Sequence, residues 1–326
     1  MNRTTGAAQP RFSVVICVYT EQRWDDIMAA IASVRAQSLP AHELIVVVDH
    51  NDGLLSRLVD GLPPVYDGPP VVIVANHYQR GLSGGKNTGV SYATGDVVAF
   101  LDDDAFAEPE WLKYFADCYG APAIVGVGGL TLPNWDSARP SWFPREFDWV
   151  LGCNYLGLAS GRQRVRNLLG GNASFRREVF DQVGGFTSDA GRSVQAGRPA
   201  ARLPLGCEET EFCIKIGQQL PDSRLIIDDR AVIWHRVPDQ RARLRYFVTR
   251  CYAEGLSKAV VTRRVGSADG LAAERRHAFA TLPAGLARCL RESARGDLAG
   301  IGRAGAIIAG LSATTAGYLA GRLTGR

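Results

Sequence analysis

A run of apolar residues that ends in three consecutive carboxylates most restricts how this chain can fold. Residues 97–101 have the length and composition of a strand buried on both faces of a sheet, and Asp102, Asp103 and Asp104 follow directly. Adjacent carboxylates repel one another, and a divalent cation with oxygen ligands would relieve that repulsion. A helix start is the alternative, because Asp is a good N-cap and Pro109 can open a helix. The triplet therefore predicts a metal–phosphate site or a helix cap.

Three further apolar runs and one helical pattern predict an α/β fold. Residues 11–19, 44–48 and 71–75 are apolar and rich in β-branched side chains, and residues 24–37 carry apolar side chains at helical spacing. Alternating strands and helices form parallel crossovers, and ligands of such sheets bind beyond the carboxyl ends of the strands. The residues expected on that rim, with the acidic triplet, are Tyr19, Thr20, Glu21 and Asp49.

A glycine-rich segment, residues 80–89, lies between the third run and the acidic triplet. Its backbone N–H groups could face an anion at the start of a helix near residue 90, and Arg80 and Lys86 add positive charge. Asn87 departs from the P-loop pattern, and the segment does not follow the first strand as a dinucleotide fingerprint would. A phosphate-binding loop is one interpretation, and a glycine-rich turn with solvated basic residues is the other.

The second half of the chain offers an acid pair, a histidine and a concentration of aromatic residues. Glu208 and Glu209 follow a glycine at the start of a predicted helix, where they could cap the helix or supply a general base. His235 follows two short apolar runs, and a lone histidine is more often structural than functional. The aromatic residues near Trp142 are interpreted mainly as core, with an acceptor cleft as the alternative.

The charge of the chain is unevenly distributed. Residues 1–229 hold 20 Lys and Arg against 27 Asp and Glu, whereas residues 230–326 hold 17 against 6. This asymmetry predicts an anionic partner for the C-terminal third, such as a membrane surface or an acidic acceptor. Because no known nucleic-acid-binding motif accompanies the charge, no nucleic-acid partner is expected.

The C-terminal segment 283–326 mixes leucines and isoleucines with arginines and contains an uncharged run at residues 304–320. That run is shorter than the roughly 20 residues of a spanning helix, so a basic helix lying on an anionic leaflet is favoured over a spanning or re-entrant segment. A packed helix pair or an oligomer contact is the alternative. Seven cysteines without C-x-x-C spacing and a polar start at residues 1–10 predict a cytoplasmic protein with reduced thiols.

Taken in order from about residue 12 to about residue 258, these motifs resemble the family 2 glycosyltransferases, which are inverting enzymes of the GT-A fold. The resemblance implies a mostly parallel, Rossmann-like α/β sheet flanked by helices, with a basic helical C-terminal extension. Its motifs are residues 13–20, 45–49, 81–89, the D-x-D motif at 101–104, 170–172 with 184–186, and 208–209. The implied divisions are a disordered N-terminus at 1–10, a nucleotide-sugar half at 11–120, an acceptor half at 121–260, and a membrane-associated extension at 261–326.

The resemblance also implies roles for individual residues and a Mn²⁺ or Mg²⁺ cofactor. Glu209 is expected to be the catalytic base with Glu208 beside it, although the family often has Glu-Asp here, and residues 49–52 depart from its usual Asp-Asp-Gly-Ser. The expected metal ligands are Asp104, Asp102 and His235. The expected donor contacts are Tyr19, Thr20, Glu21, Asp49, Arg80, Lys86, Asp102 and Asp103, and the expected acceptor contacts are Gly171, Asn172 and Trp142.

The expected function is transfer of a sugar from a nucleotide-diphosphate sugar to a hydroxyl or phosphate of a lipid-linked or polysaccharide acceptor. Residues 251–258 are similar to a stretch in lipid-linked sugar transferases of archaea and actinobacteria, which favours a polyprenyl-phosphate acceptor and a peripheral location on the inner face of the cell membrane. A nucleotidyltransferase that makes nucleotide-sugars and a non-catalytic sugar-nucleotide-binding module are the alternatives.

Overall fold

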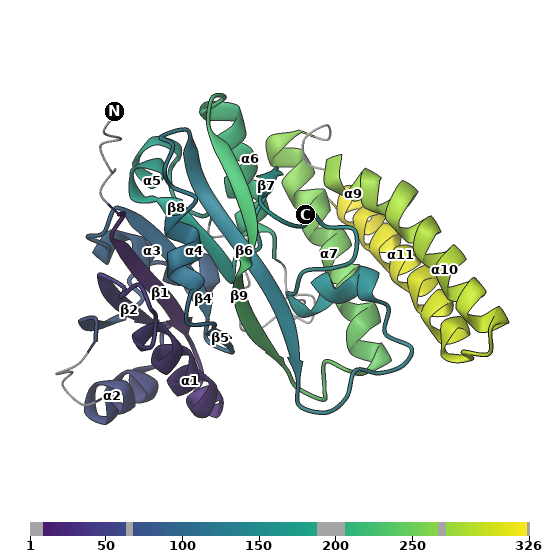
Figure 1. Cartoon of the computed structure of the whole chain (residues 1–326), viewed down its shortest axis with the longest axis horizontal. Coiled ribbons are helices and arrows are strands. Elements are labelled where there is room, and N and C mark those ends of the chain that lie inside the picture. The colour runs from purple at the N-terminus through teal and green to yellow at the C-terminus, as the bar shows by residue number, and fades with distance from the viewer. Residues whose placement is uncertain (1–8, 63–67, 188–205, 267–271, 325–326) are drawn as a thin grey trace, which may run out of the picture.

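The computed structural model describes residues 9–62, 68–187, 206–266 and 272–324 of the chain. A central sheet carries helices on both faces, and the C-terminal helices form a separate group beside it (Figure 1). The predicted disorder of residues 1–10 falls mainly on residues outside this description. The strand order of the main sheet is β3-β2-β1-β4-β8-β6-β9-β5, and β7 pairs with β9.

The first four strands are parallel, as the alternating pattern predicts. Strands β1, β2 and β4 are almost fully buried, whereas β3 is a half-buried strand at the edge of the sheet. Successive side chains point to opposite faces, so the strands contribute to two separate hydrophobic cores. Helices α1, α2 and α4 cover one face, and α3, α5 and α6 cover the other. The strands are β1 (Phe12–Val18), β2 (Glu43–Val48), β3 (Val71–Ala75) and β4 (Val97–Asp102). The helices are α1 (Trp24–Arg35), α2 (Asp52–Gly61), α3 (Leu82–Tyr92), α4 (Trp111–Ala116), α5 (Arg177–Val183) and α6 (Glu208–Gln219).

The second half of the sheet is mixed, in contrast to the mostly parallel arrangement that was predicted. Strand β8 runs antiparallel to β4 and β6, whereas β6 and β9 are parallel to each other. The two apolar runs predicted at 225–227 and 231–234 form one long strand, β9, whose register against β6 shifts between them. The remaining strands are β5 (Ala105–Ala107), β6 (Ile124–Trp135), β7 (Gln163–Val165), β8 (Asn172–Arg176) and β9 (Arg224–Val237).

The glycine-rich segment is not a loop, because helix α3 begins at Leu82 and contains most of it. A side chain at Gly89 would overlap Val15 of β1, and one at Gly84 would overlap the backbone of Gln79. The glycines therefore allow the first turns of α3 to lie directly on the sheet. This placement buries Lys86 inside the protein.

The C-terminal helical group, which begins before the predicted extension at 261–326, consists of α7 (Leu244–Val265), α9 (Ala272–Arg276), the π-helical η4 (His277–Thr281), α10 (Leu282–Ala294) and α11 (Ala299–Leu323). It packs on the 3-10 segment η2 (Arg145–Leu151) through a third core that includes Phe147, Phe247 and Ile307. Helices α7 and α11 come into backbone contact, because a side chain at Gly255 would overlap the carbonyl oxygen of Thr314. The packed-helix alternative is thus confirmed for this part of the chain.

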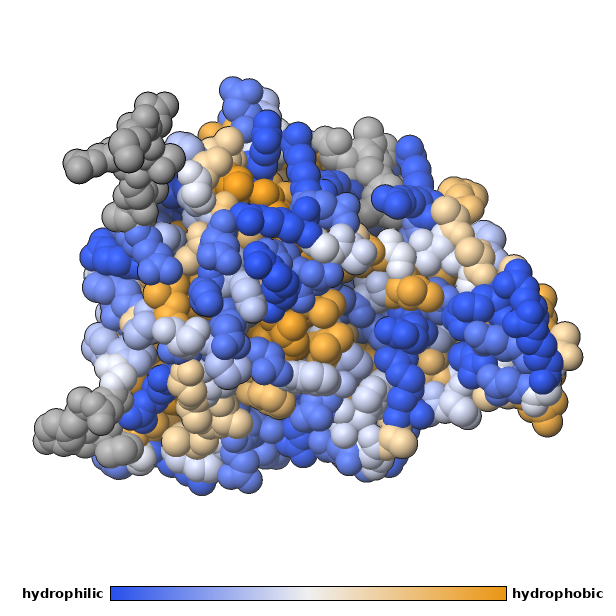
Figure 2. Space-filling view, viewed as in Figure 1, coloured by the Kyte–Doolittle hydropathy of each residue, from blue (hydrophilic) through white to orange (hydrophobic). Residues whose placement is uncertain are grey.

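Helix α11 also has an exposed apolar face. Ile301, Ile308, Leu319 and Leu323 are all more than half exposed, and their spacing places them on one stripe of the helix. Figure 2 shows hydrophobic residues along the outer edge of this helical group, next to strongly hydrophilic ones. Among the described residues, α11 is the one helix long and apolar enough to cross a membrane, and a third of its most apolar window is buried against the protein.

Candidate active site

The acidic triplet forms the end of β4 and the turn into β5, and no helix begins within residues 102–110. The helix-cap alternative is therefore wrong, since α4 begins after Glu110. Strand β5 pairs antiparallel with β9 in a register that places His235 opposite Ala105. This pairing brings His235 Nε2 to 3.1 Å from Asp104 Oδ1 and 3.9 Å from Asp102 Oδ2.

The three side chains Asp102, Asp104 and His235 form a cluster suited to a divalent ion. One potential ligand atom from each lies within 4.8 Å of the others. Two carboxylates and one imidazole suit Mn²⁺ and related divalent ions. Asp104 and His235 are buried, whereas the Asp102 side chain is 31% exposed and lines the adjoining cavity. The donor set therefore fits the metal that the D-x-D motif predicts.

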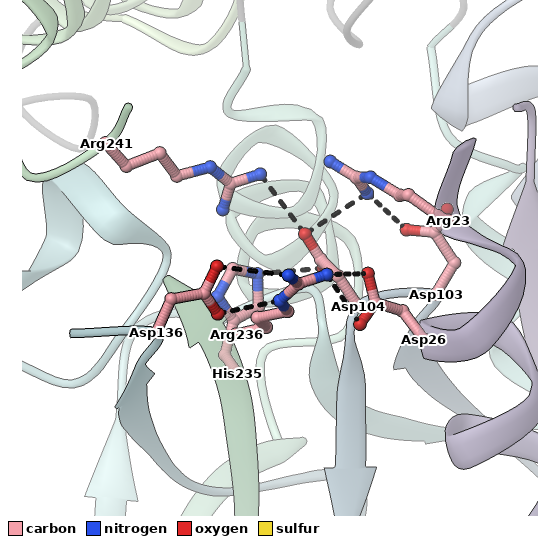
Figure 3. Close-up of polar contacts among 8 residues, drawn as sticks. All are labelled: Arg23, Asp26, Asp103, Asp104, Asp136, His235, Arg236 and Arg241. Atoms are coloured by element: carbon pink, nitrogen blue, oxygen red, sulfur yellow. Dashed lines mark hydrogen bonds and ion pairs between the residues drawn. The ribbon is translucent and has the colours of Figure 1, made fainter. Parts of the chain in front are cut away.

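Two arginines form ion pairs with the carboxylates of Asp103 and Asp104 (Figure 3). Arg23 Nη1 lies 2.6 Å from Asp103 Oδ1, and Arg241 Nη2 lies 3.1 Å from Asp104 Oδ2. Burial opposes ionisation of Asp104, but the neighbouring His235, Arg241 and Arg23 outweigh it and hold the pKa of Asp104 well below its usual value. Burial and the charge of Asp104 raise the pKa of Asp103 to about 7. Asp104 is therefore the permanently charged member of the pair.

The end of β9 is fixed by a neighbouring ion-pair network. Arg236 Nη1 lies 2.8 Å from Asp26 Oδ2 of α1, and its Nε lies 2.8 Å from Asp136 Oδ1, just after β6 (Figure 3). Because Arg236 directly follows His235, these contacts restrain the strand that presents the imidazole.

The residues predicted to contact the nucleoside gather around the carboxyl ends of β1 and β2. Asp49 accepts hydrogen bonds from Asn76 Nδ2 at 2.7 Å and from the Gly81 N–H at 3.0 Å. Arg80 Nη2 donates to the carbonyl oxygen of His50 at 2.7 Å. The other three are placed at the same rim: Tyr19 is 49% exposed, Thr20 caps the 3-10 turn η1 (Glu21–Arg23), and Glu21 lies beside Gly53.

A buried lysine joins α3 to the acid pair at the start of α6. Lys86 Nζ lies 2.5 Å from Glu209 Oε1 and 3.6 Å from Glu208 Oε1, and the Lys86 side chain is only 2% exposed. Its ammonium group also lies 5.3 Å from the ring centroid of Phe186. The structure thus places Lys86 behind the acid pair, whereas the sequence predicted that it contacts the donor.

The two carboxyl groups of the pair have opposite proton affinities. Burial, followed by repulsion from Glu209, raises the pKa of Glu208 to about 8. Burial acts in the same direction on Glu209, but the charge and hydrogen bond of Lys86 outweigh it and lower the pKa of Glu209 to about 2. Near neutral pH the pair therefore holds one proton, on Glu208, and the Glu209 carboxylate is ionised.

The glycine pair before β8 lies between the acid pair and the metal cluster. A side chain at Gly170 would overlap the Glu209 carboxylate, and one at Gly171 would overlap the Asp102 carboxylate. The carboxylates of Glu209 and Asp102 therefore both pack against the short backbone segment formed by Gly170 and Gly171. Of the other predicted acceptor residues, Asn172 is fully buried and accepts a hydrogen bond from Trp111 Nε1 at 2.8 Å, and Trp142 packs on Phe247. Neither lines the cavity, so we place neither among the acceptor contacts.

A cavity of about 610 Å³ extends from the acid pair to the C-terminal helices. Asp102, Glu208 and Glu209 line one end together with the glycine pair. The remainder is lined by charged side chains and by apolar and aromatic side chains from η2 and from the C-terminal helices, including Phe147, Trp149, Leu282, Leu311 and Tyr318. The cavity thus connects the carboxylates at the rim of the sheet to the C-terminal helices.

Two site residues, Arg23 and Arg241, were missed in the sequence. Arg23 lies five residues after β1, so the rule that ligands bind at the strand ends could have identified it. Arg241 lies in the basic C-terminal third, and nothing in its local sequence distinguishes it from its neighbours. Its contact with Asp104 arises because the chain turns back toward the rim after β9.

A mixed α/β sheet whose rim holds a D-x-D cluster, a histidine and a carboxylate pair defines the GT-A class of glycosyltransferases. Residues 13–184, more than half of the chain, match the family model described as glycosyl transferase family 2. The chain belongs to glycosyltransferase family 2. It is a metal-dependent sugar transferase, and the nucleotidyltransferase and binding-module alternatives are not supported.

Among its relatives, the chain is 36% identical over 252 residues to a glucosyl-dolichyl phosphate glucuronosyltransferase of Haloferax volcanii, covering 77% of both chains. It is 27% identical over 256 residues to the succinoglycan biosynthesis protein ExoM of Rhizobium meliloti, covering 74% of this chain and 71% of the relative. A solved mannosyltransferase from Pyrobaculum calidifontis, in complex with GDP-Man and Mn²⁺, has a TM-score of 0.59 at 20% identity, covering 98% of this chain and 87% of the other. This last similarity supports the GT-A fold.

Proposed function

We propose that this protein transfers a sugar, with inversion, from a nucleotide-diphosphate sugar to a hydroxyl group of a polyprenyl-phosphate-linked acceptor. One observation carries the proposal: the cavity that holds Asp102 and Glu209 at one end is closed at the other by the C-terminal helices. An acceptor with a polar head and an apolar chain matches those two ends. Residues 11–120 would hold the donor, residues 121–260 the acceptor head, and residues 261–326 the lipid.

In the proposed reaction, Glu209 takes the proton of the acceptor hydroxyl as its oxygen attacks the anomeric carbon. The bond from that carbon to the diphosphate breaks on the opposite side, and the diphosphate leaves with the electron pair. Asp102, Asp104 and His235 would hold Mn²⁺ or Mg²⁺, which offsets the charge that builds on the leaving diphosphate. Lys86 and protonated Glu208 orient Glu209 toward the cavity.

The archaeal relative, whose name includes a dolichyl phosphate substrate, supports the lipid-linked acceptor. The manganese in the mannosyltransferase complex supports Mn²⁺ as the first metal to test. The rhizobial relative, named for the biosynthesis of a polysaccharide, favours a second candidate, in which the acceptor is a polysaccharide intermediate. Both candidates share the donor site and the base.

We further propose that the enzyme lies on the cytoplasmic face of the cell membrane. The exposed apolar stripe of α11 (Ile301, Ile308, Leu319 and Leu323) would enter the interfacial region, and the excess of arginine in residues 283–326 would favour anionic lipids. All seven cysteines are free, which agrees with a reducing compartment.

The test is a transfer assay with purified full-length protein, Mn²⁺ and labelled UDP-, GDP- and dTDP-sugars. Short-chain polyprenyl-phosphate sugars and soluble oligosaccharides are offered as acceptors. The proposal predicts a lipid-linked product whose new glycosidic bond has the anomeric configuration opposite to that of the donor, as measured by NMR. Retention of configuration would refute inversion, and transfer to oligosaccharides alone would favour the polysaccharide candidate.

A further inference from the structure

The part of the cavity beyond the acid pair is strongly cationic. Apart from the residues of the reacting end, its ionisable lining contains two carboxylates, Glu254 and Glu274, against five basic side chains. Arg164 and Arg276 are exposed, whereas Arg250 and Lys258 are buried, and a buried cation is costly unless anionic groups lie beside it. The basic side chains are Arg164, Arg166, Arg250, Lys258 and Arg276.

Arg250, Glu254 and Lys258 form a ladder along one side of α7, each residue one helical turn from the next. Arg250 Nη1 lies 3.2 Å from Glu254 Oε2, and Lys258 Nζ lies 3.6 Å from Glu254 Oε1. The Arg250 side chain is only 8% exposed, yet its Nη1 makes no hydrogen bond within the described residues. Arg250 and Lys258 share the Glu254 carboxylate, and Arg250 Nη1 keeps donor capacity for a ligand in the cavity.

This ladder is attached to the backbone that carries the acid pair. The Gly206 N–H donates to Ser257 Oγ at 3.1 Å, and Cys207 Sγ donates to Glu254 Oε1 at 3.2 Å. Glu208 is the next residue along the chain. Cys207 has a φ of +84°, a left-handed conformation that is unfavourable for a residue with a side chain, so these contacts hold a strained turn in place.

On the other side, the ladder adjoins the lipid-facing helices. Lys258 Nζ also lies 2.7 Å from Glu274 Oε1 of α9, and Gly255, between the two cations, contacts Thr314 of α11. Both ring nitrogens of the half-buried His277 in η4 lack hydrogen-bond partners among the described residues. The cations thus lie between the base and the apolar end of the cavity.

We propose that Arg250 and Lys258 form the site for the phosphate of the lipid-linked acceptor. Arginine binds phosphate oxygens through two parallel hydrogen bonds, and a buried arginine loses less hydration energy than a lysine would. The order of groups in the cavity, from carboxylate to cations to apolar lining, then matches sugar, phosphate and lipid. The site lies outside residues 13–184, the part that matches the family model. The inference rests on the proposed lipid-linked acceptor.

The test compares the binding of farnesyl phosphate and of uncharged farnesol by titration calorimetry. EDTA is present, so that the phosphate cannot bind through a metal at the donor site. We expect the wild type to bind farnesyl phosphate at least about tenfold more tightly than farnesol, and Arg250→Gln to lose that preference. Arg245→Gln, an exposed position on the same helix that does not line the cavity, is the matched control and should bind as the wild type does.

Arg250→Gln leaves Glu254 with fewer partners, so the double variant Arg250→Gln/Glu254→Gln keeps the test valid if the single variant unfolds. Equal binding of the two ligands by the wild type, or an unchanged preference in a folded Arg250 variant, would refute the phosphate site. Transfer to a lipid-linked acceptor with an unchanged acceptor KM in Arg250→Gln would also refute it, while the proposed function would stand. A phosphate preference that depends on Arg250, without transfer to any lipid-linked acceptor, would instead refute the proposed function.

Discussion

Lys86 Nζ lies 2.5 Å from Glu209 Oε1, inside the protein, and links helix α3 to helix α6. Few lysines are this deeply buried, and this one is stabilised by both members of the acid pair. The contact lowers the pKa of Glu209 and leaves the proton of the pair on Glu208. The lysine thereby sets which carboxylate is free to act as the base.

Replacing Lys86 by Met should raise the pKa of Glu209, because burial and the neighbouring Glu208 would then act without opposition. If ionised Glu209 is the base, the acidic limb of the kcat profile should move to higher pH by roughly one to three units. Steady-state rates between pH 4 and pH 9 measure the shift. Lys215→Met is the control, since Lys215 pairs with Glu211 on the same helix and does not line the cavity. An unmoved acidic limb in Lys86→Met would contradict the assigned role.

The pH dependence of stability should change in the variant Glu208→Gln. The pKa of Glu208 is about 8 in the folded protein against a usual value of 4.5, so the folded state keeps a proton that the unfolded state has lost. Between these two pH values, the free energy of unfolding of the wild type falls as pH rises. Glutamine resembles the protonated acid, so the variant should avoid this fall. The stability of the variant relative to the wild type should therefore be greater at pH 8 than at pH 5, by an amount on the order of a few kcal/mol.

Urea unfolding of both proteins at pH 5 and pH 8 gives the comparison. Glu211→Gln provides a control of opposite sign on the same helix. Burial raises the pKa of Glu211, but its contacts with Lys215, Thr187 and Arg264 lower it overall, so its charge stabilises the fold above pH 4.5. Because folded Glu211 is ionised at both pH values, that variant should be less stable than the wild type at pH 5 and at pH 8 alike. An identical pH dependence of Glu208→Gln and wild type would exclude the raised pKa.

The parts of the fold that follow from local sequence patterns were predicted well. The runs that became β1, β2 and β4 are apolar enough to be buried on both faces, and the end of β4 located the D-x-D cluster. The pairing of His235 with the triplet was implied by the family resemblance, and the register of β5 against β9 explains it.

What could not be predicted depends on contacts between distant segments. The glycines of α3 were interpreted as a loop, because their close contact with Val15 of β1 is not visible in the sequence. Lys86 was assigned to the donor, because its partner Glu209 is 123 residues away. Trp142 was assigned to the acceptor, whereas it packs under the C-terminal helices beside Gly302.

Replacing Asp104 by Asn should abolish metal-dependent binding of the donor. Asp104 is the cluster member whose carboxylate stays ionised, so its loss removes both a ligand and a charge. In a thermal-shift assay with Mn²⁺ and UDP-, GDP- or dTDP-sugars at about 100 times Kd, the wild type should gain roughly 2.7 kcal/mol and the variant close to none. Asp60→Asn removes the same charge at an exposed position of α2, away from the cluster, and should respond as the wild type does. A full shift in Asp104→Asn would overturn the metal site.

The membrane prediction needs point variants, because truncation at residue 283 would remove Ile307 and other members of the core around Phe247. Serine at Ile301, Ile308 and Leu319 should weaken sedimentation with anionic liposomes by about tenfold or more, since each lost side chain contributes on the order of 1 kcal/mol when half inserted.

The matched control for this experiment places serine at three exposed apolar positions outside the extension: Val59, Tyr92 and Leu156. This control variant should sediment with the liposomes as the wild type does. Equal loss in both variants would show that general surface polarity, and not the α11 stripe, governs the association.

Removal of the acceptor proton by Glu209 is tested most directly by single-turnover sugar transfer by Glu209→Gln with the donor and Mn²⁺ already bound. Glutamine keeps the shape of the side chain but cannot accept the proton. We predict that transfer falls by about 100-fold or more while the thermal shift with donor and Mn²⁺ stays within error of the wild type. Transfer at the wild-type rate by Glu209→Gln would contradict the account.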